Sequence, residues 1–119
     1  MKSDIKTTED IDLLVDAFYS SVQSSDTLSP FFASLDWDLH LPKMKAFWRF
    51  ILLDQEGYTT NVTEKHLNMP LNQEHFSEWL GLFNQSIDGL FEGEKSELAK
   101  ERAKWIAFTI QSKMGLFKN

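Results

Sequence analysis

Apolar residues recur along the chain at spacings of three and four residues, the period of a helix with one buried face. The first stripe consists of Ile11, Leu14, Val15, Phe18 and Val22. Thr7 or Thr8 is the expected N-cap, because a hydroxyl oxygen can accept from backbone N–H groups that the first turn leaves free. Residues 24–26, a Ser-Ser-Asp run, are expected to end this helix.

Three further stripes predict three more long helices, and no stretch alternates with the period of two that is typical of strands. Their apolar positions are Leu41, Met44, Phe47, Trp48 and Ile51; then Phe76, Trp79, Leu80, Phe83, Ile87, Leu90 and Phe91; then Leu98, Trp105, Ile106, Thr109, Ile110 and Met114. Asp36 and Asn72 are N-cap candidates for the first two of these helices. Residues 92–93 separate the last two.

Shorter segments fall between the stripes. Residues 29–32 (SPFF) and 63–67 are each expected to form a helical turn, and residues 54–61 a loop. Pro42 lies inside the second stripe and has no backbone N–H, which is tolerated only in the first turn of a helix. We therefore expect this helix to begin close to Pro42, with His40 at or just before its start.

Length and composition predict one globular unit. The 119 residues, 42% of them hydrophobic, are expected to form a single all-α domain, residues 1–119. With 12 basic and 18 acidic residues the net charge is −6, which argues against nucleic-acid or anionic-membrane partners. Cysteine is absent, and residues 1–6 lack the apolar run of a signal peptide, so we expect a cytoplasmic protein.

The three histidines are the first candidates for metal chemistry. None belongs to an HExxH motif, and none follows a carboxylate by three residues as in a di-iron bundle. His66 is either a partly exposed helix-end residue or a single axial ligand to a cofactor metal. His40 is interpreted as a helix-start residue facing solvent, and His75, beside Glu74 and Glu78, as part of a solvated face.

Two aromatic residues carry polar tips on apolar stripes. Tyr19 follows Phe18 on the first helix, and Trp79 lies on the third. When buried, each needs a hydrogen-bond partner for its O–H or N–H. Both are therefore either core residues with one satisfied bond or donors into a cavity.

Several segments together point to a family. They are Phe18-Tyr19, Pro30-Phe31-Phe32, the run from Trp37 to Met44, Phe47-Trp48, His66-Leu67 with Pro70, and Trp79-Leu80 with Phe83. In this order and spacing they resemble the group III truncated haemoglobins of bacteria. The match runs from about Ile11 to about Met114.

The resemblance implies a two-over-two helical sandwich around haem b (iron protoporphyrin IX). His66 would be the proximal iron ligand, Tyr19 and Trp79 the distal donors, and His40 the residue at the distal gate. Further haem contacts would come from Met44, Phe31, Phe32, Phe47, Phe83 and Ile106. Lys43 is either a partner of a haem propionate or a solvated lysine.

The function implied by the resemblance is binding of dioxygen, nitric oxide, carbon monoxide or peroxide at the iron. Two donors would slow ligand release, which favours redox chemistry, such as nitric oxide dioxygenation or peroxide detoxification, over transport. Such chemistry would need a reductase, which the sequence does not identify. His40 is also a candidate sixth ligand, giving a bis-histidine iron. A monomer is expected.

Three alternatives stay open at this stage. The aromatic stripes could be the ordinary core of a haem-free helical interaction domain. The globin could instead be a sensor, although 119 residues leave no room for an output domain. It could also store oxygen, which a pocket with two donors disfavours.

Overall fold

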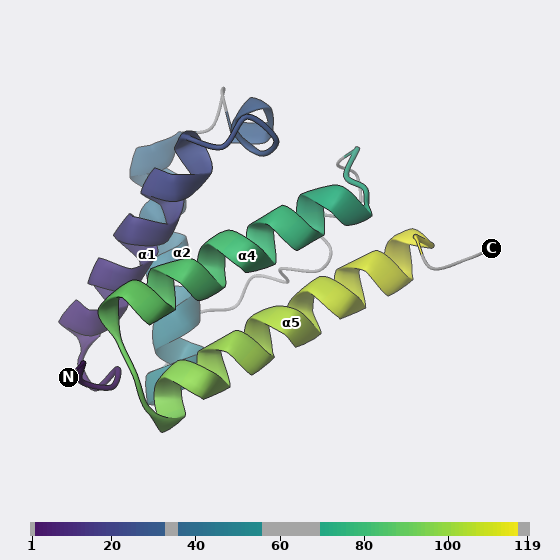
Figure 1. The fold of residues 1–119 in the computed structure, drawn as a ribbon. Helices are drawn as coiled ribbons and strands as arrows, with labels where there is room; N and C mark the ends of the chain where they lie inside the picture. Colours follow the sequence, from purple (N-terminus) through teal and green to yellow (C-terminus); the bar gives the residue numbers. More distant parts are fainter. Residues whose placement is uncertain (1, 33–35, 56–69, 117–119) are drawn as a thin grey trace.

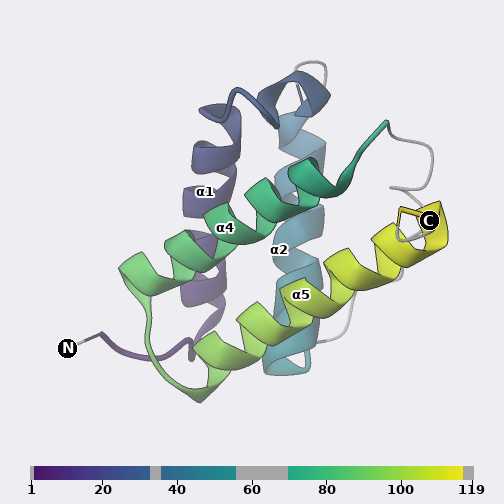
Figure 2. The ribbon, with the colours of Figure 1, turned by 45° about the vertical axis from the view of Figure 1, so that its right-hand side comes forward.

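Two antiparallel helix pairs build the fold, one lying across the other (Figure 1). The computed structural model describes residues 2–32, 36–55 and 70–116 of the chain. Within these ranges the elements are all helical: α1 (Thr8–Gln23), the 3₁₀ turn η1 (Ser29–Phe32), α2 (Trp37–Leu53), α4 (Gln73–Leu90) and α5 (Glu94–Met114). Figure 2 shows α4 and α5 crossing in front of α1 and α2. The predicted all-α class is confirmed.

The first helix forms as its pattern predicts. Thr7 is the N-cap, and it forms a capping box with Asp10, in which each side chain accepts from the other residue's backbone N–H. All five residues of the predicted stripe are buried, and so is Tyr19. The helix ends at Gln23, directly before the predicted Ser-Ser-Asp run.

The start of α2 differs from the prediction. Asp36 is the N-cap as expected, but the helix begins at Trp37, so Pro42 lies in its second turn. His40 is therefore fully helical, and its backbone N–H donates to the Asp36 carbonyl at 2.9 Å. Pro42 cannot donate to the carbonyl four residues earlier. The cap and the aromatic packing of Trp37 stabilise this first turn in spite of that loss.

The capping of α4 corrects the interpretation of His75. Asn72 accepts from the backbone N–H groups of Glu74 and His75, and His75 Nδ1 accepts from the Asn72 N–H at 2.9 Å. His75 is half-buried, with its ring against Phe31 at 4.7 Å between centroids. It therefore closes a capping box instead of belonging to a solvated face.

The buried face of α5 also differs from the prediction. Trp105 is 62% exposed, although the pattern placed it on the apolar stripe. The buried stripe is instead made largely of small residues, namely Ser96, Ala99, Ala103 and Ala107. Small side chains let α5 lie close against α4, its main neighbour. Along the described helices, no stretch has the length and apolar character needed to cross a membrane.

The N-terminal segment supplies the cap that α5 lacks. Gly93, the N-cap residue of α5, offers no side chain, and Asp4, which lies 91 positions before Lys95 in the sequence, takes that role. The Asp4 carboxylate accepts from the backbone N–H of Lys95 at 2.8 Å, and from the N–H and hydroxyl of Ser96 at 2.9 and 2.8 Å. A Cβ at Gly93 would lie 2.5 Å from Asp4 Cγ, so only glycine fits there.

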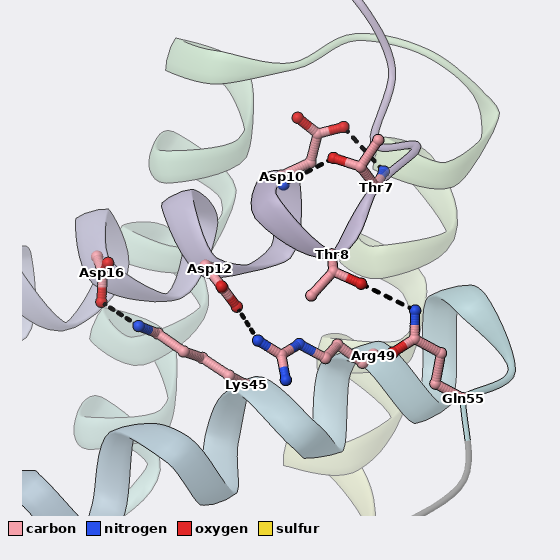
Figure 3. Close-up of polar contacts among 8 residues, drawn as sticks. All are labelled: Thr7, Thr8, Asp10, Asp12, Asp16, Lys45, Arg49 and Gln55. Atoms are coloured by element: carbon pink, nitrogen blue, oxygen red, sulfur yellow. Dashed lines mark hydrogen bonds and ion pairs between the residues drawn. The ribbon is translucent and has the colours of Figure 1, made fainter.

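A row of polar contacts joins the outer faces of α1 and α2 (Figure 3). Asp16 pairs with Lys45 at 3.0 Å, and Asp12 pairs with Arg49. Gln55 Nε2 donates to the Thr8 hydroxyl at 3.0 Å. Exposed pairs of this kind add little free energy. The three α1 residues, Thr8, Asp12 and Asp16, are spaced four apart and so lie on one face of α1.

Candidate functional site

Tyr19 and His40, two of the predicted distal residues, are in direct contact. Tyr19 lies on α1 and His40 on α2, and their ring centroids are 5.0 Å apart with the planes at 85°. Tyr19 is only 6% exposed, and His40 is half-buried. The antiparallel pairing of α1 and α2 thus brings together two polar aromatic groups that are 21 positions apart in the sequence.

Two further aromatic rings enclose this pair. Trp37 lies 5.5 Å from Tyr19 and 5.7 Å from His40, both edge-on, and Phe32 of η1 stacks on Trp37 at 5.8 Å. Phe32 also contacts Tyr19 and His40, at 6.2 Å in each case. Edge-on and stacked contacts at such distances are the favourable geometries for aromatic pairs. They hold the rings of Tyr19 and His40 in a defined orientation.

Trp79 reaches the same cluster from α4 through one intervening ring. Phe18 contacts Tyr19 at 4.9 Å and Trp79 at 5.8 Å, so it lies between the two predicted donors. On its other side Trp79 stacks almost parallel on Phe83, with 5.8 Å between centroids and 6° between planes. Tyr19, His40 and Trp79 therefore belong to one aromatic cluster built from α1, α2 and α4.

A buried polar contact fixes α4 beside this cluster. The hydroxyl of Ser25, directly after α1, donates to the Glu78 carboxylate at 2.9 Å. The same hydroxyl accepts from the backbone N–H of Leu28 at 3.2 Å. Since Glu78 precedes Trp79, this contact sets the position of the Trp79 backbone relative to the end of α1.

The remaining space between α2 and α4 is spanned by large side chains. No Cα atoms of these two helices come within 8 Å of each other, whereas α1 approaches both. Trp48 of α2 stacks on Phe83 of α4 at 4.7 Å and bridges the separation. Three predicted haem-contacting residues, Met44, Phe47 and Ile106, pack against this core while remaining partly exposed, and so does the predicted donor Trp79.

Known proteins resemble this chain in both sequence and fold. A Campylobacter jejuni protein named Group 3 truncated hemoglobin ctb is 31% identical over 119 residues, covering 94% of each chain. The chain belongs to the group 3 truncated haemoglobins. The crystal structure of group III truncated hemoglobin from Campylobacter jejuni has a TM-score of 0.87, with 31% identity, covering 99% of this chain and 97% of that one. No protein-family model matches the chain.

The likeness confirms the two-over-two sandwich that the resemblance implied for this truncated haemoglobin. Its two layers are the α1–α2 pair and the α4–α5 pair (Figure 2). The aromatic cluster lies where α1 contacts both α2 and α4. The fold therefore positions the candidate distal residues by contacts between the layers as well as within one layer.

Not every predicted site residue joins the cluster of this truncated haemoglobin. Phe31 packs against His75 at the start of α4, and Lys43 is exposed on α2. Phe83 does join it, since it contacts Phe18 and Trp79, but it is completely buried. His66, the predicted proximal ligand, lies outside the described residues. Among the residues that are described, no three His, Cys, Asp or Glu side chains gather to hold a metal ion.

Sequence reasoning did not single out Trp37, Phe18 or the Ser25–Glu78 contact as parts of the site. Trp37 carries a usable signal, because it lies three residues before His40 and so shares a face of α2 with it. Phe18 is predicted as part of the apolar stripe and of the Phe18-Tyr19 motif, with no role of its own in the site. The Ser25–Glu78 contact joins positions 53 residues apart, and no local pattern indicates it.

Proposed function

We propose that this truncated haemoglobin binds haem b, with His66 as the proximal iron ligand, and that its function is redox chemistry on small diatomic ligands or peroxide. The observation that carries the proposal is the cluster in which Tyr19 touches His40 and lies one ring away from Trp79. Two groups able to exchange hydrogen bonds thus touch each other, and a third lies one aromatic ring away.

The residues present fit a flat apolar macrocycle. Haem is largely apolar, and binding sites for such molecules are lined mostly by apolar and aromatic side chains with a few polar groups. Met44, Phe47 and Ile106 offer half-exposed apolar surface on α2 and α5, next to the tightly packed core.

Haem, when bound, would supply an iron that can bind dioxygen, nitric oxide, carbon monoxide or peroxide. The chain itself supplies the hydrogen-bonding groups. The Tyr19 hydroxyl and the Trp79 indole N–H are donors, and Trp37 and Phe32 keep His40 beside Tyr19. A donor that meets a ligand bearing partial negative charge stabilises it and slows its loss.

Slow release favours redox chemistry over transport, since a carrier must let its ligand go. The same donors suit reactions that cleave or transfer oxygen atoms, because such reactions develop negative charge on the ligand. Nitric oxide dioxygenation and peroxide reduction are both of this kind. An electron-donating protein would be needed to return the iron to its ferrous state.

Addition of haemin to the purified protein tests the proposal. We expect a sharp Soret band that shifts when the dithionite-reduced protein takes up carbon monoxide. His66→Ala should abolish this band while the far-ultraviolet circular dichroism stays helical. His75→Ala is the matched control, since His75 caps α4 and should leave the band in place.

Two outcomes would decide against parts of the proposal. If no specific Soret band forms in a folded protein, the chain is a haem-free helical domain and the aromatic cluster is core. If the band survives in His66→Ala, the proximal ligand has been assigned to the wrong residue. A low-spin ferric spectrum that is lost in His40→Ala would identify His40 as a sixth ligand.

A further inference from the structure

Trp37 connects the buried ring of Tyr19 with the surface of the protein. Its ring lies edge-on against Tyr19, with 5.5 Å between the centroids, and also stacks on Phe32. Tyr19 is 6% exposed, whereas Trp37, the first residue of α2, is partly exposed. Tyrosine and tryptophan can each lose and regain a single electron, which phenylalanine cannot do under the same conditions. The two rings therefore form a path for an electron between solvent and the place where Tyr19 is proposed to meet a ligand.

The other aromatic neighbours offer no equivalent path. Phe18 separates Tyr19 from Trp79, and a phenylalanine ring does not relay an electron in this way. Trp105 is the tryptophan with the largest exposure, at 62%, but it lies on α5 and stacks on Phe108 instead of on the cluster. Trp37 is thus the tryptophan that contacts Tyr19 directly and also reaches the surface.

The chain around Trp37 is acidic. Asp36 and Asp38, on either side of it, are both exposed. Residues 7–42, which include α1, η1 and the start of α2, contain seven Asp or Glu and no Lys or Arg, and α4 contains no Lys or Arg either. The basic residues of α2 begin at Lys43, six positions after Trp37 and so on another face of the helix. A tryptophan that has lost an electron is a cation, which nearby carboxylates stabilise, and the same carboxylates repel anions.

We propose that Trp37 is a surface site at which a phenol without negative charge gives up one electron, and that Tyr19 carries this electron to the haem site when peroxide is reduced there. The inference rests on the proposed function, with peroxide as the oxidant. Peroxide takes up two electrons and two protons and leaves as two waters, while two phenol molecules each lose one electron and one proton and become phenoxyl radicals. In each transfer Tyr19 gives an electron and its hydroxyl proton to the haem site, and Trp37 gives an electron to Tyr19. The phenol then restores Trp37, and the proton that it releases to solvent balances the one that Tyr19 takes up again.

Peptide mass spectrometry identifies the residue that loses the electron. The haem-loaded protein receives an equimolar amount of peroxide without any phenol, and we expect tryptophan with added oxygen at Trp37. Trp105 is the matched reference, because its larger exposure makes it react first if peroxide attacks the surface directly. Oxidation of Trp105 equal to that of Trp37, or the same oxidation of Trp37 in the haem-free protein, would overturn the proposal.

Two variants of Trp37 separate electron transfer from packing. Trp37→Phe and Trp37→Tyr introduce rings of the same size, but only the tyrosine ring can relay an electron. With tyramine as the phenol, we expect formation of dityramine to be lost in Trp37→Phe and recovered in Trp37→Tyr. The rate at which peroxide changes the Soret band is measured in the same samples, so that a slower peroxide step is not mistaken for a lost relay. Trp105→Phe should leave both rates unchanged. Wild-type dityramine formation in Trp37→Phe, or equal loss in both Trp37 variants, would contradict a relay.

A pair of phenols tests the part that charge plays at this site. Tyramine is a cation and para-hydroxyphenylacetate an anion on similar rings, and we expect tyramine to be oxidised faster. Asp36→Asn with Asp38→Asn should remove this preference, since Asn still serves as an N-cap. Glu92→Gln with Glu94→Gln removes the same charge at exposed positions of the α4–α5 turn and should keep it. Equal oxidation of both phenols by wild type would overturn the assigned substrate class.

The Soret band distinguishes failure of this inference from failure of the proposed function. A Soret band that peroxide leaves unchanged would contradict the proposed peroxide chemistry and the relay together. A Soret band that changes while Trp37 stays unmodified would contradict the relay alone.

Discussion

At the scale of single residues, the two candidate donors differ in how they are held. The Tyr19 ring is enclosed by Phe18, Phe32, Trp37 and His40 and is almost completely buried. Trp79 is half-exposed and contacts Phe18 and Phe83. If both act on a bound ligand as proposed, Tyr19 is the more rigid donor, because more rings restrict it.

Removing the Tyr19 hydroxyl should speed the loss of dioxygen. A hydrogen bond to a group bearing charge contributes about 1.5–3 kcal/mol, so Tyr19→Phe is expected to raise the dissociation rate by roughly ten- to a hundredfold. Stopped-flow measurement on the ferrous haem-loaded protein gives this rate. An unchanged rate would show that Tyr19 does not donate to the ligand.

Trp79→Leu is expected to act in the same direction through loss of the indole N–H. Its effect should be similar or smaller, because a half-exposed side chain is less firmly held in place. Trp105→Leu is the control, since it removes an exposed indole on the outer face of α5. Equal changes in the two variants would mean that Trp79 has no specific role in ligand retention.

At the scale of elements, the start of α5 depends on a segment far away in sequence. Burial raises the pKa of the Asp4 carboxyl, but hydrogen bonds from the Lys95 backbone, the Ser96 hydroxyl and the Ile5 and Ser96 backbone outweigh it and hold that pKa below its usual value. The carboxylate also lies at a helix N-terminus, where negative charge is favourable. Charged Asp4 therefore stabilises the folded protein.

Asp4→Asn tests this capping contact. We expect a loss of about 1–2 kcal/mol in the free energy of unfolding near neutral pH, because Asn has no charge and only one acceptor oxygen, whereas both Asp4 oxygens accept hydrogen bonds. A carboxyl whose folded pKa is lowered contributes stability above its unfolded pKa of about 3.9, and this contribution is lost as the pH falls through the folded pKa. The difference between wild type and variant should therefore shrink below about pH 4.

Urea unfolding at several pH values measures this dependence. Asp26→Asn is the control, because Asp26 is exposed and makes none of the hydrogen bonds found among the described residues. A deficit in Asp4→Asn that stays constant from neutral to acid pH would show that the carboxylate charge is not what stabilises α5.

At the scale of the whole molecule, the two helix pairs are held together by an aromatic stack. Phe83 is completely buried, with Trp48 of the other layer on one side, Trp79 on another and Phe18 edge-on at 5.2 Å. It therefore joins α1, α2 and α4 at one point. A cavity at this position would weaken the packing between the α1–α2 layer and the α4–α5 layer.

Phe83→Ala is expected to lower the free energy of unfolding by about 3–5 kcal/mol, from lost burial and the cavity left behind. Phe50→Ala makes the same chemical change at a position that is 48% exposed on α2, and should cost much less. Thermal or urea unfolding compares the two. Similar losses in both variants would contradict a central role for the stack.

Local pattern was sufficient for much of the architecture. The four long helices, the caps at Thr7, Asp36 and Asn72, and the all-α class all follow from neighbours three or four residues apart. Such contacts depend only on residues that are close together in the sequence. The truncated haemoglobin family and the site roles of Tyr19, His40 and Trp79 came instead from the resemblance of whole motifs to that family, which periodicity alone does not show.

Other features depended on contacts between distant segments. The helix α2 begins at Trp37, five residues before Pro42, because Trp37 packs on Tyr19 and Phe32. Trp105 faces outward because α5 packs on α4 through small residues, which an apolar pattern does not mark. The Asp4 cap joins residues more than 90 positions apart. Periodicity describes which face a single helix can bury. Only the packing of all the helices decides which face is buried and which distant side chains meet.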